Sequence, residues 1–208
     1  MPEGAFPLHR PARMAVFASG SGTNLQALLD AFPPSGAEPL AQVVLTISDR
    51  RAAPALDRAR RAGAVAEHVA YPRRPDGSLD RPAFEAHAQA LLDEHRIDLV
   101  ALAGFLRIVS AEFVAAWSGR LLNVHPSLLP AFPGLHAVRQ ALEAGVARTG
   151  CTVHFVDAGV DTGPTIVQRT VDVVPGDTEE ALQARVQREE HRAYPEAVRR
   201  VLRGVARP

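Results

Sequence analysis

Asn123 and His125 end an otherwise apolar segment, residues 121–125. Side chains two positions apart on a strand point to the same face, so the amide and the imidazole project together. An amide and an imidazole buried without partners would cost about 1–3 kcal/mol each, so a ligand, or each other and the backbone, must satisfy them. Pro126 then ends the strand, because it has no amide donor. The pair indicates either a functional site or a structural pair whose polar groups satisfy each other and the backbone.

Two aspartates follow in a glycine-containing loop, and either could lie beside His125. Asp157 and Asp161 are both candidates, and each could instead be a plain turn residue. A carboxylate next to an imidazole stabilises the imidazolium and raises its pKa, which makes the histidine a better proton donor. His154, on the strand before this loop, is expected to order the loop.

Residues 19–24, Ser-Gly-Ser-Gly-Thr-Asn, follow a first apolar strand and open a helix. Glycines allow a sharp turn, and the amides of such a loop and helix N-terminus can hold an anion. A dinucleotide fingerprint is the alternative, and Asp49 lies where its ribose-binding acid would be. The third glycine of that motif would fall on Leu25, which would hold the helix away from the strand. A site for a single phosphate is therefore preferred over a dinucleotide site and over a structural turn.

Glu190 falls on the apolar stripe of the last helix, four positions after Val186 and three before Ala193. A carboxylate at a core-facing position needs a partner. One interpretation is a salt bridge to one of the many arginines, and the other is recognition of a cationic or amino ligand. Gln187 borders the same stripe.

The elements that must position these residues alternate along the chain. Buried strands are predicted at 14–18, 43–47, 65–69, 98–103 and 121–125, and the helices between them at 24–32, 51–61 and around 84–92. Near-continuous apolar strands separated by amphipathic helices are typical of a doubly wound, mostly parallel sheet, whose ligands bind beyond the carboxyl ends of the strands.

The pattern changes after residue 150. Segments 152–156 and 165–174 lie too close together for a helical crossover, which predicts antiparallel strands added at one edge of the sheet. Asp177 and Glu180 resemble a capping box that opens a long last helix, ending near Gly204. The fold class is therefore α/β, with a flexible tail at residues 1–12 and a single domain at 13–208.

Composition limits the function further. The 208 residues carry 23 basic and 23 acidic side chains, so no global basic field favours nucleic acid or a membrane surface. All the basic residues are arginines, which excludes lysine Schiff-base chemistry and a Walker-type phosphate loop. Neither the single cysteine, Cys151, nor the spacing of His125, His136 and His154 suits a metal site, so no metal is expected. No segment has the length of a membrane span, and we expect a cytoplasmic protein.

Six segments in order resemble the phosphoribosylglycinamide formyltransferase family of purine synthesis. They are SGSGTNLQ (19–26), LAGFLRI (102–108), NVHPSLLP (123–130), FPGLH (132–136), VHFVDAGVDTGP (153–164) and ARVQ with EH (184–187 and 190–191). Together they span nearly the whole chain, from about residue 14 to residue 200.

The resemblance implies a role for each matching residue. It implies Asn123, His125 and Asp161 as the catalytic trio, which favours Asp161 over Asp157, with His154 in support. The substrate's phosphate would be held by Gly20, Ser21, Gly22, Thr23 and Asn24, and its ribose or glycinamide end by Gln187 and Glu190. The folate pocket would be lined by Leu102, Phe105, Leu106, Arg107, Ile108, Val109, Val156 and Asp157, with Arg81 near the glutamate tail. The Leu129-Pro130 bond is expected to be cis.

The implied reaction transfers the formyl group of 10-formyltetrahydrofolate, a co-substrate, to the amine of glycinamide ribonucleotide without a metal. The amine attacks the formyl carbon, and Asn123 with protonated His125 stabilises the oxyanion of the tetrahedral intermediate. Asp161 sustains the imidazolium and, through water, helps to move the proton to the departing folate nitrogen. The partners are these two small molecules, and the chain is expected to be a monomer or a homodimer.

Two relatives of this family are alternatives. A formyltetrahydrofolate deformylase would carry a second histidine where this chain has Pro126, lack the Ser-Gly-rich loop and add an N-terminal regulatory domain. A methionyl-tRNA formyltransferase would need an additional C-terminal domain and a basic surface. Neither pattern fits this sequence.

Overall fold

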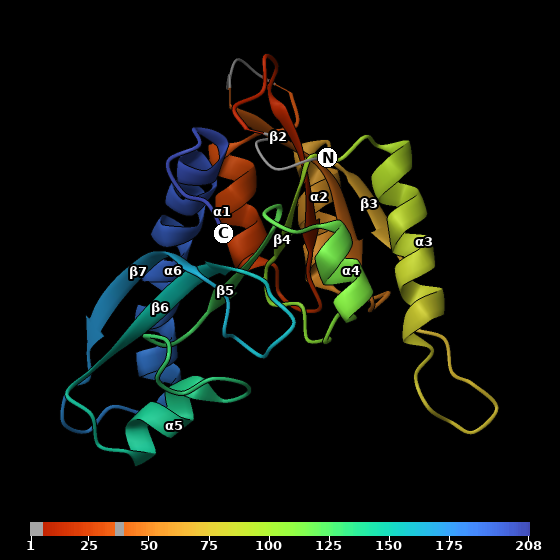
Figure 1. Cartoon of the computed structure of the whole chain (residues 1–208). Helices are drawn as coiled ribbons and strands as arrows, with labels where there is room; N and C mark the ends of the chain where they lie inside the picture. Colours follow the sequence, from red (N-terminus) through yellow and green to blue (C-terminus); the bar gives the residue numbers. More distant parts are fainter. Residues whose placement is uncertain (1–5, 36–39) are drawn as a thin grey trace.

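The computed structural model describes residues 6–35 and 40–208, which form one seven-stranded sheet with helices on both faces (Figure 1). The strands are β1 (Ala12–Phe17), β2 (Ala41–Ser48), β3 (Val65–His68), β4 (Leu99–Leu102), β5 (Leu121–His125), β6 (Arg148–Phe155) and β7 (Thr165–Asp172). The helices are α1 (Thr23–Ala31), α2 (Pro54–Ala62), α3 (Arg81–Glu94), α4 (Ala111–Ala116), α5 (Ala137–Glu143) and α6 (Glu179–Leu202).

The strand order is β3-β2-β1-β4-β5-β6-β7. Strands β1 to β5 pair in parallel, whereas β6 pairs antiparallel with β5 and β7 antiparallel with β6. The predicted fold class, a doubly wound sheet with antiparallel strands at one edge, is confirmed. The chain reverses its direction across the sheet between β1 and β4, which is the point where open α/β sheets form their ligand crevice.

The alternation of side chains along β1 builds the two halves of the core. Met14 and Val16 point to the face that α1 and α6 cover, and Ala15 and Phe17 to the face of α3 and α4. All four are fully buried. A strand that is apolar on both faces lies in the middle of a three-layer domain, so the loops that follow β1 and β4 start from fixed positions.

Two short helices and two helix starts differ from the sequence prediction; α2 begins at Pro54, three residues after the predicted start at residue 51. The sequence did not predict α4 and α5, because neither is long enough to show a helical repeat. Helix α6 begins with Thr178 as its N-cap, whose side chain accepts from the Ala181 amide. The predicted capping box at Asp177 is wrong by one residue, since Asp177 instead pairs with Arg185.

Part of the predicted tail packs on the domain. Phe6 and Leu8 lie against the core, and Arg10 forms an ion pair of 2.6 Å with the buried Asp98. Residues 1–5 are outside the described residues, so the domain boundary stays a prediction. Over the described ranges 6–35 and 40–208, no helix is long and apolar enough to cross a membrane.

Candidate active site

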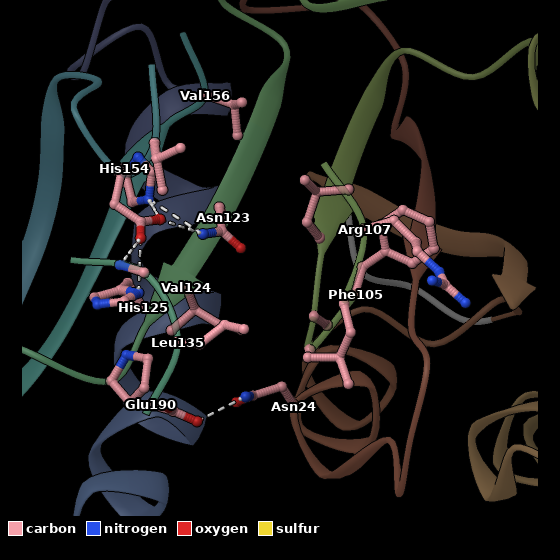
Figure 2. Close-up of a pocket in the computed structure, with 18 of the residues that line it drawn as sticks. Asn24, Phe105, Arg107, Asn123, Val124, His125, Leu135, His154, Val156 and Glu190 are labelled. Carbon is pink, nitrogen blue, oxygen red and sulfur yellow. Dashed lines mark hydrogen bonds and ion pairs between the residues drawn. The ribbon is translucent and has the colours of Figure 1, made fainter. Parts of the chain in front are cut away.

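A cavity of about 640 Å³ lies beyond the carboxyl ends of β1, β4 and β5. The loops that form it are tied together across the switch point: the Ser19 amide donates to the Gly104 carbonyl at 3.0 Å, and the Leu106 amide donates to Ser19 Oγ at 3.0 Å. Figure 2 shows Asn123, His125 and His154 on one side of the cavity and Phe105 on the other. Every site residue predicted from the sequence lines this cavity except Arg81.

Asn123 and His154 are cross-strand neighbours on β5 and β6. Asn123 Nδ2 lies 3.2 Å from His154 Nε2 and donates to Asp161 Oδ1 at 3.4 Å. His154 Nδ1 lies 2.8 Å from the Phe155 carbonyl, which favours a proton on Nδ1 and leaves Nε2 as an acceptor for the amide. His154 therefore fixes the orientation of the Asn123 side chain.

Both ring nitrogens of the buried His125 contact oxygen atoms. Nδ1 lies 3.2 Å from Asp161 Oδ2, and Nε2 lies 2.8 Å from the carbonyl of Phe132. In addition, Asp161 accepts from the Gly134 amide at 2.8 Å. The polar groups at the end of β5 therefore satisfy one another and the backbone in the structure, and a reacting oxygen must replace one of these contacts.

Burial and hydrogen bonding act in opposite directions on this cluster. Burial lowers the pKa of His125 below 6.5, and the Phe132 carbonyl and Asp161 offset only part of that effect. Asp161 does raise the pKa of His125, as expected, but burial has the larger, opposite effect. Burial also opposes ionisation of Asp161, but the adjacent His154 ring, the hydrogen bond from the Gly134 amide and the charge of His125 lower its pKa below 3.8. Asp161 is thus an anion at neutral pH.

The loop after β6 places Asp161, not Asp157, beside His125. Asp157 Oδ1 accepts from the Gly159 amide at 3.1 Å and from the Thr162 hydroxyl at 2.8 Å, so it orders the turn. Gly163 makes this path possible, because a Cβ there would lie 1.9 Å from the carbonyl oxygen of Phe155.

At the other end of the cavity, the anion loop (residues 20–24) leads from β1 into α1. Helix α6 contacts this loop: Gln187 Nε2 donates to Thr23 Oγ1 at 2.8 Å. Gly22 is the N-cap of α1 and has a φ of 72°, a conformation that glycine adopts without strain. The turn into α1 therefore depends on the glycine at position 22.

Replacing Gly22 with alanine is expected to destabilise the protein by about 2–4 kcal/mol, because strain at positive φ adds to overpacking. The new Cβ would lie 2.7 Å from Ala55 Cα on α2. A thermal melt followed by circular dichroism should show a fall of roughly 5 °C or more. Gly20→Ala is the matched control, because a Cβ there meets nothing within 4 Å. Equal melting temperatures for the two variants would contradict this account of the loop.

Glu190 lies beside the anion loop with its carboxylate buried. Its partner is the Asn24 amide, which donates to Oε2 at 2.8 Å, and not an arginine. Burial raises the pKa of Glu190 above 4.5, and the hydrogen bond from Asn24 lowers it only in part. The buried Asn24 Oδ1 has no hydrogen-bond partner among the described residues. Asn24 Oδ1 is thus a buried acceptor that still lacks a donor at this end of the cavity.

Glu190→Gln is expected to make the ligand-free protein more stable at pH 8 than the parent. The folded protein holds the Glu190 proton more tightly than the unfolded chain does, so the parent loses stability as pH rises from 4.5 through the raised pKa. Glutamine is neutral throughout and can still accept from Asn24. Urea midpoints at pH 4 and pH 8 check this, with the gain present at pH 8 and absent at pH 4. A variant no more stable than the parent at pH 8 would show that burying the ionised Glu190 carboxylate does not destabilise the protein.

The wall opposite the trio is apolar and carries one arginine. Arg107 Nε donates to Asp49 Oδ2 at 2.7 Å, and the guanidinium lies 5.1 Å from the centre of the Tyr71 ring. Asp49, the acid that a dinucleotide site would need, pairs with Arg107 and does not line the cavity. Arg81 lines a neighbouring cavity of about 490 Å³ that shares Arg107 with the main one.

The sequence analysis missed two backbone groups that hold the trio. The Phe132 carbonyl and the Gly134 amide contact His125 and Asp161 from a loop in which both residues have positive φ. Backbone atoms carry no side-chain signal, and the FPGLH motif was the only hint. The predicted cis bond at Leu129-Pro130, just before this loop, is confirmed.

The fold and the cavity define the class of protein: the chain belongs to the formyl transferase family, whose profile matches residues 12–198. Two curated proteins are similar to this chain. The phosphoribosylglycinamide formyltransferase of Escherichia coli is 44% identical over 182 residues, which are 88% of this chain and 83% of the relative. A trifunctional purine biosynthetic protein, adenosine-3 of Drosophila melanogaster, is 46% identical over 197 residues, or 95% of this chain, but the chain spans only 14% of that protein's length.

A solved structure agrees with these relatives. The crystal structure of glycinamide ribonucleotide transformylase 1 from Symbiobacterium toebii superposes with a TM-score of 0.85 at 49% identity, covering 95% of this chain and 90% of the other. The resemblance predicted from the six motifs is confirmed.

Proposed function

We propose that this protein transfers the formyl group of 10-formyltetrahydrofolate to the amino group of glycinamide ribonucleotide in de novo purine biosynthesis. The main support is that one cavity holds the Asn123, His125 and Asp161 cluster at one end and the anion loop with the buried Glu190 carboxylate at the other. A phosphorylated amine that spans the cavity would place its amino group near the cluster. Its small-molecule partners, a cytoplasmic location and a monomeric or homodimeric state belong to the same proposal.

Asn123 and His125 act on the formyl oxygen. As the amine attacks the formyl carbon, negative charge develops on that oxygen, and preorganised donors stabilise it by roughly 3–4 kcal/mol each. The hydrogen bond that Asn123 Nδ2 donates to Asp161 is the longest hydrogen bond in the cluster, at 3.4 Å, so a ligand oxygen displaces Asp161 from this N–H at the least cost. The same oxygen competes with the Phe132 carbonyl for His125 Nε2.

Asp161 keeps His125 ready for this charge. The pKa of the ligand-free imidazole is low because of burial, and a new negative oxygen beside it favours the protonated form. The carbon–nitrogen bond to the folate then breaks, and the proton of the attacking amine passes, through water near Asp161, to the departing nitrogen. No covalent bond to the protein forms.

The two ends of the cavity suit the two substrates. The anion loop binds the phosphate, while Gln187, Glu190 and the free Asn24 Oδ1 accept or donate to the ribose and glycinamide groups. On the folate side, Leu102, Phe105, Leu106, Ile108, Val109 and Val156 offer an apolar wall of the kind that binds a flat ring, together with Asp157. Arg107 and Arg81 lie toward the neighbouring cavity, where a glutamate tail would emerge.

The deciding experiment follows the absorbance change as formyltetrahydrofolate loses its formyl group, with and without glycinamide ribonucleotide. Loss that requires the ribonucleotide and yields its formyl derivative is the expected result. Loss that is indifferent to the ribonucleotide would mean transfer to water, as in a deformylase. Absence of any folate turnover, combined with tight nicotinamide dinucleotide binding, would reject the proposal altogether.

Glu190→Gln is also expected to weaken the binding of the amine substrate by about tenfold, since a charge-assisted hydrogen bond is lost. Affinity for the folate should stay within about twofold, because Glu190 lies at the other end of the cavity. Calorimetric titration of each substrate separately checks both values. Unchanged affinity for the amine substrate would remove Glu190 from its binding site.

A further inference from the structure

Helix α2 contributes no residue to the lining of the active-site cavity, yet it holds the anion loop from behind. The Ala55 amide donates to the Gly20 carbonyl at 3.2 Å. Arg58 Nε donates to the Ser21 carbonyl at 2.8 Å. Two consecutive carbonyls of the loop are therefore bound to the same helix. This arrangement determines how the intervening peptide units face the cavity.

In a planar trans peptide, the carbonyl and the following N–H point in opposite directions. Because α2 binds the Gly20 and Ser21 carbonyls, the amides of Ser21 and Gly22 point away from α2, toward the cavity side. The Gly22 carbonyl accepts from the Gln26 amide at 2.9 Å within α1, which directs the Thr23 amide the same way. The amides of Ser21 and Gly22 donate no hydrogen bond to any described residue. Successive free amides of this kind form an anion-binding nest.

We propose that Arg58 is a positioning residue for phosphate binding: its Nε–H holds the Ser21 carbonyl against α2, so that the Ser21–Gly22 peptide presents its amide to the phosphate. This inference rests on the proposed function for the identity of the phosphorylated ligand. Arg58 acts through the backbone of Ser21 and does not touch the substrate. Without that bond the exposed Ser21 peptide is free to rotate, and binding must first order it.

The rest of the Arg58 side chain keeps the guanidinium in place. Nη1 donates to Gln26 Oε1 at 3.3 Å on the first turns of α1. Arg60, two positions later on α2, instead forms an exposed pair with Asp57 at 2.9 Å. The helix therefore offers one arginine that contacts the loop and another that serves as a control for charge.

Two substitutions separate the hydrogen bond from the charge. In Arg58→Gln, Nε2 of the glutamine occupies the place of the arginine Nε and can still donate to the Ser21 carbonyl, although the charge is gone. In Arg58→Met, a methyl group occupies that place, so both the donor and the charge are lost. Arg60→Met removes a charge from the same helix without touching the loop.

The test measures kcat and KM for glycinamide ribonucleotide and for the folate in all three variants. Arg58→Met is expected to raise the KM for the ribonucleotide about tenfold relative to Arg58→Gln, since one backbone unit must be ordered on binding. The KM for the folate and kcat should remain within about twofold of the parent values. Equal KM values for Arg58→Gln and Arg58→Met, or a comparable rise in Arg60→Met, would overturn the proposal.

A binding measurement needs no turnover and so separates this inference from the proposed function. Calorimetry with ribose 5-phosphate should give the same order, with Arg58→Met binding about tenfold more weakly than Arg58→Gln. That result would support the positioning role even if glycinamide ribonucleotide proved not to be a substrate. Failure of ribose 5-phosphate to bind the parent protein, or equal affinities in the two variants, would contradict it.

Discussion

His125→Ala is expected to lower kcat for formyl transfer at least ~100-fold while both substrates still bind. The imidazole lies 3.2 Å from the Asp161 carboxylate and is the one donor at the end of β5 that can gain a full positive charge. Alanine removes that charge from a buried position, where the lower dielectric makes a charge stabilise the oxyanion more strongly than in bulk water. The loss therefore falls on the transition state and not on ground-state binding.

Single-turnover kinetics with saturating substrates would measure the effect, and calorimetry would show that binding persists. His87→Ala on α3 is a suitable control, because that histidine is exposed and lies outside the cavity. The control should keep kcat within about twofold of the parent value. A His125→Ala variant that turns over at more than about a fifth of the parent rate would remove His125 from the mechanism.

Asp161→Ala is expected to have an effect of the same size, at least ~100-fold on kcat, for a different reason. Asp161 contacts Asn123, His125, His154 and the Gly134 amide, so one carboxylate orients every donor of the cluster. Its removal leaves the amide and the imidazole free to turn away from the formyl oxygen, and it removes the anion that sustains the imidazolium.

Asp157→Asn in the same loop is the matched control. Asp157 holds the turn through Gly159 and Thr162 and does not contact His125, and asparagine can still accept both hydrogen bonds. Its kcat should fall less than about fivefold. If both variants lost activity equally, the order of the loop, and not the carboxylate beside His125, would explain the loss.

The sequence predicted those parts of the fold that depend on local pattern. The segment at 121–125 matches β5 residue for residue, because its leucines and valine favour a buried strand and Pro126 cannot continue the ladder. Helix α5 escaped prediction because its seven residues give fewer than two apolar repeats. The start of α6 was misplaced by one residue because Asp177 and Thr178 are both good caps, and only the tertiary pairing of Asp177 with Arg185 distinguishes them.

The sequence predicted the site residues whose type is unusual for their position. It missed the features that depend on how the elements pack in three dimensions. Glu190 stood out because a carboxylate on an apolar stripe contradicts the helical pattern. Arg58 did not stand out, because an arginine on an amphipathic helix is ordinary and its contact with the Ser21 carbonyl depends on the approach of α2 to the loop. The lowered pKa of His125 likewise depends on burial depth, which the sequence does not give.

The contacts between α6 and the anion loop determine when during synthesis the site can form. Gln187 bonds to Thr23, and Glu190 bonds to Asn24, so each pair joins residues more than 160 positions apart. When the loop and β1 to β5 have left the ribosome, Gln187 and Glu190 of α6 have not yet been synthesised. The nascent chain must therefore emerge past this helix before these contacts can form, and under the proposed function we expect a shorter chain to bind no amine substrate.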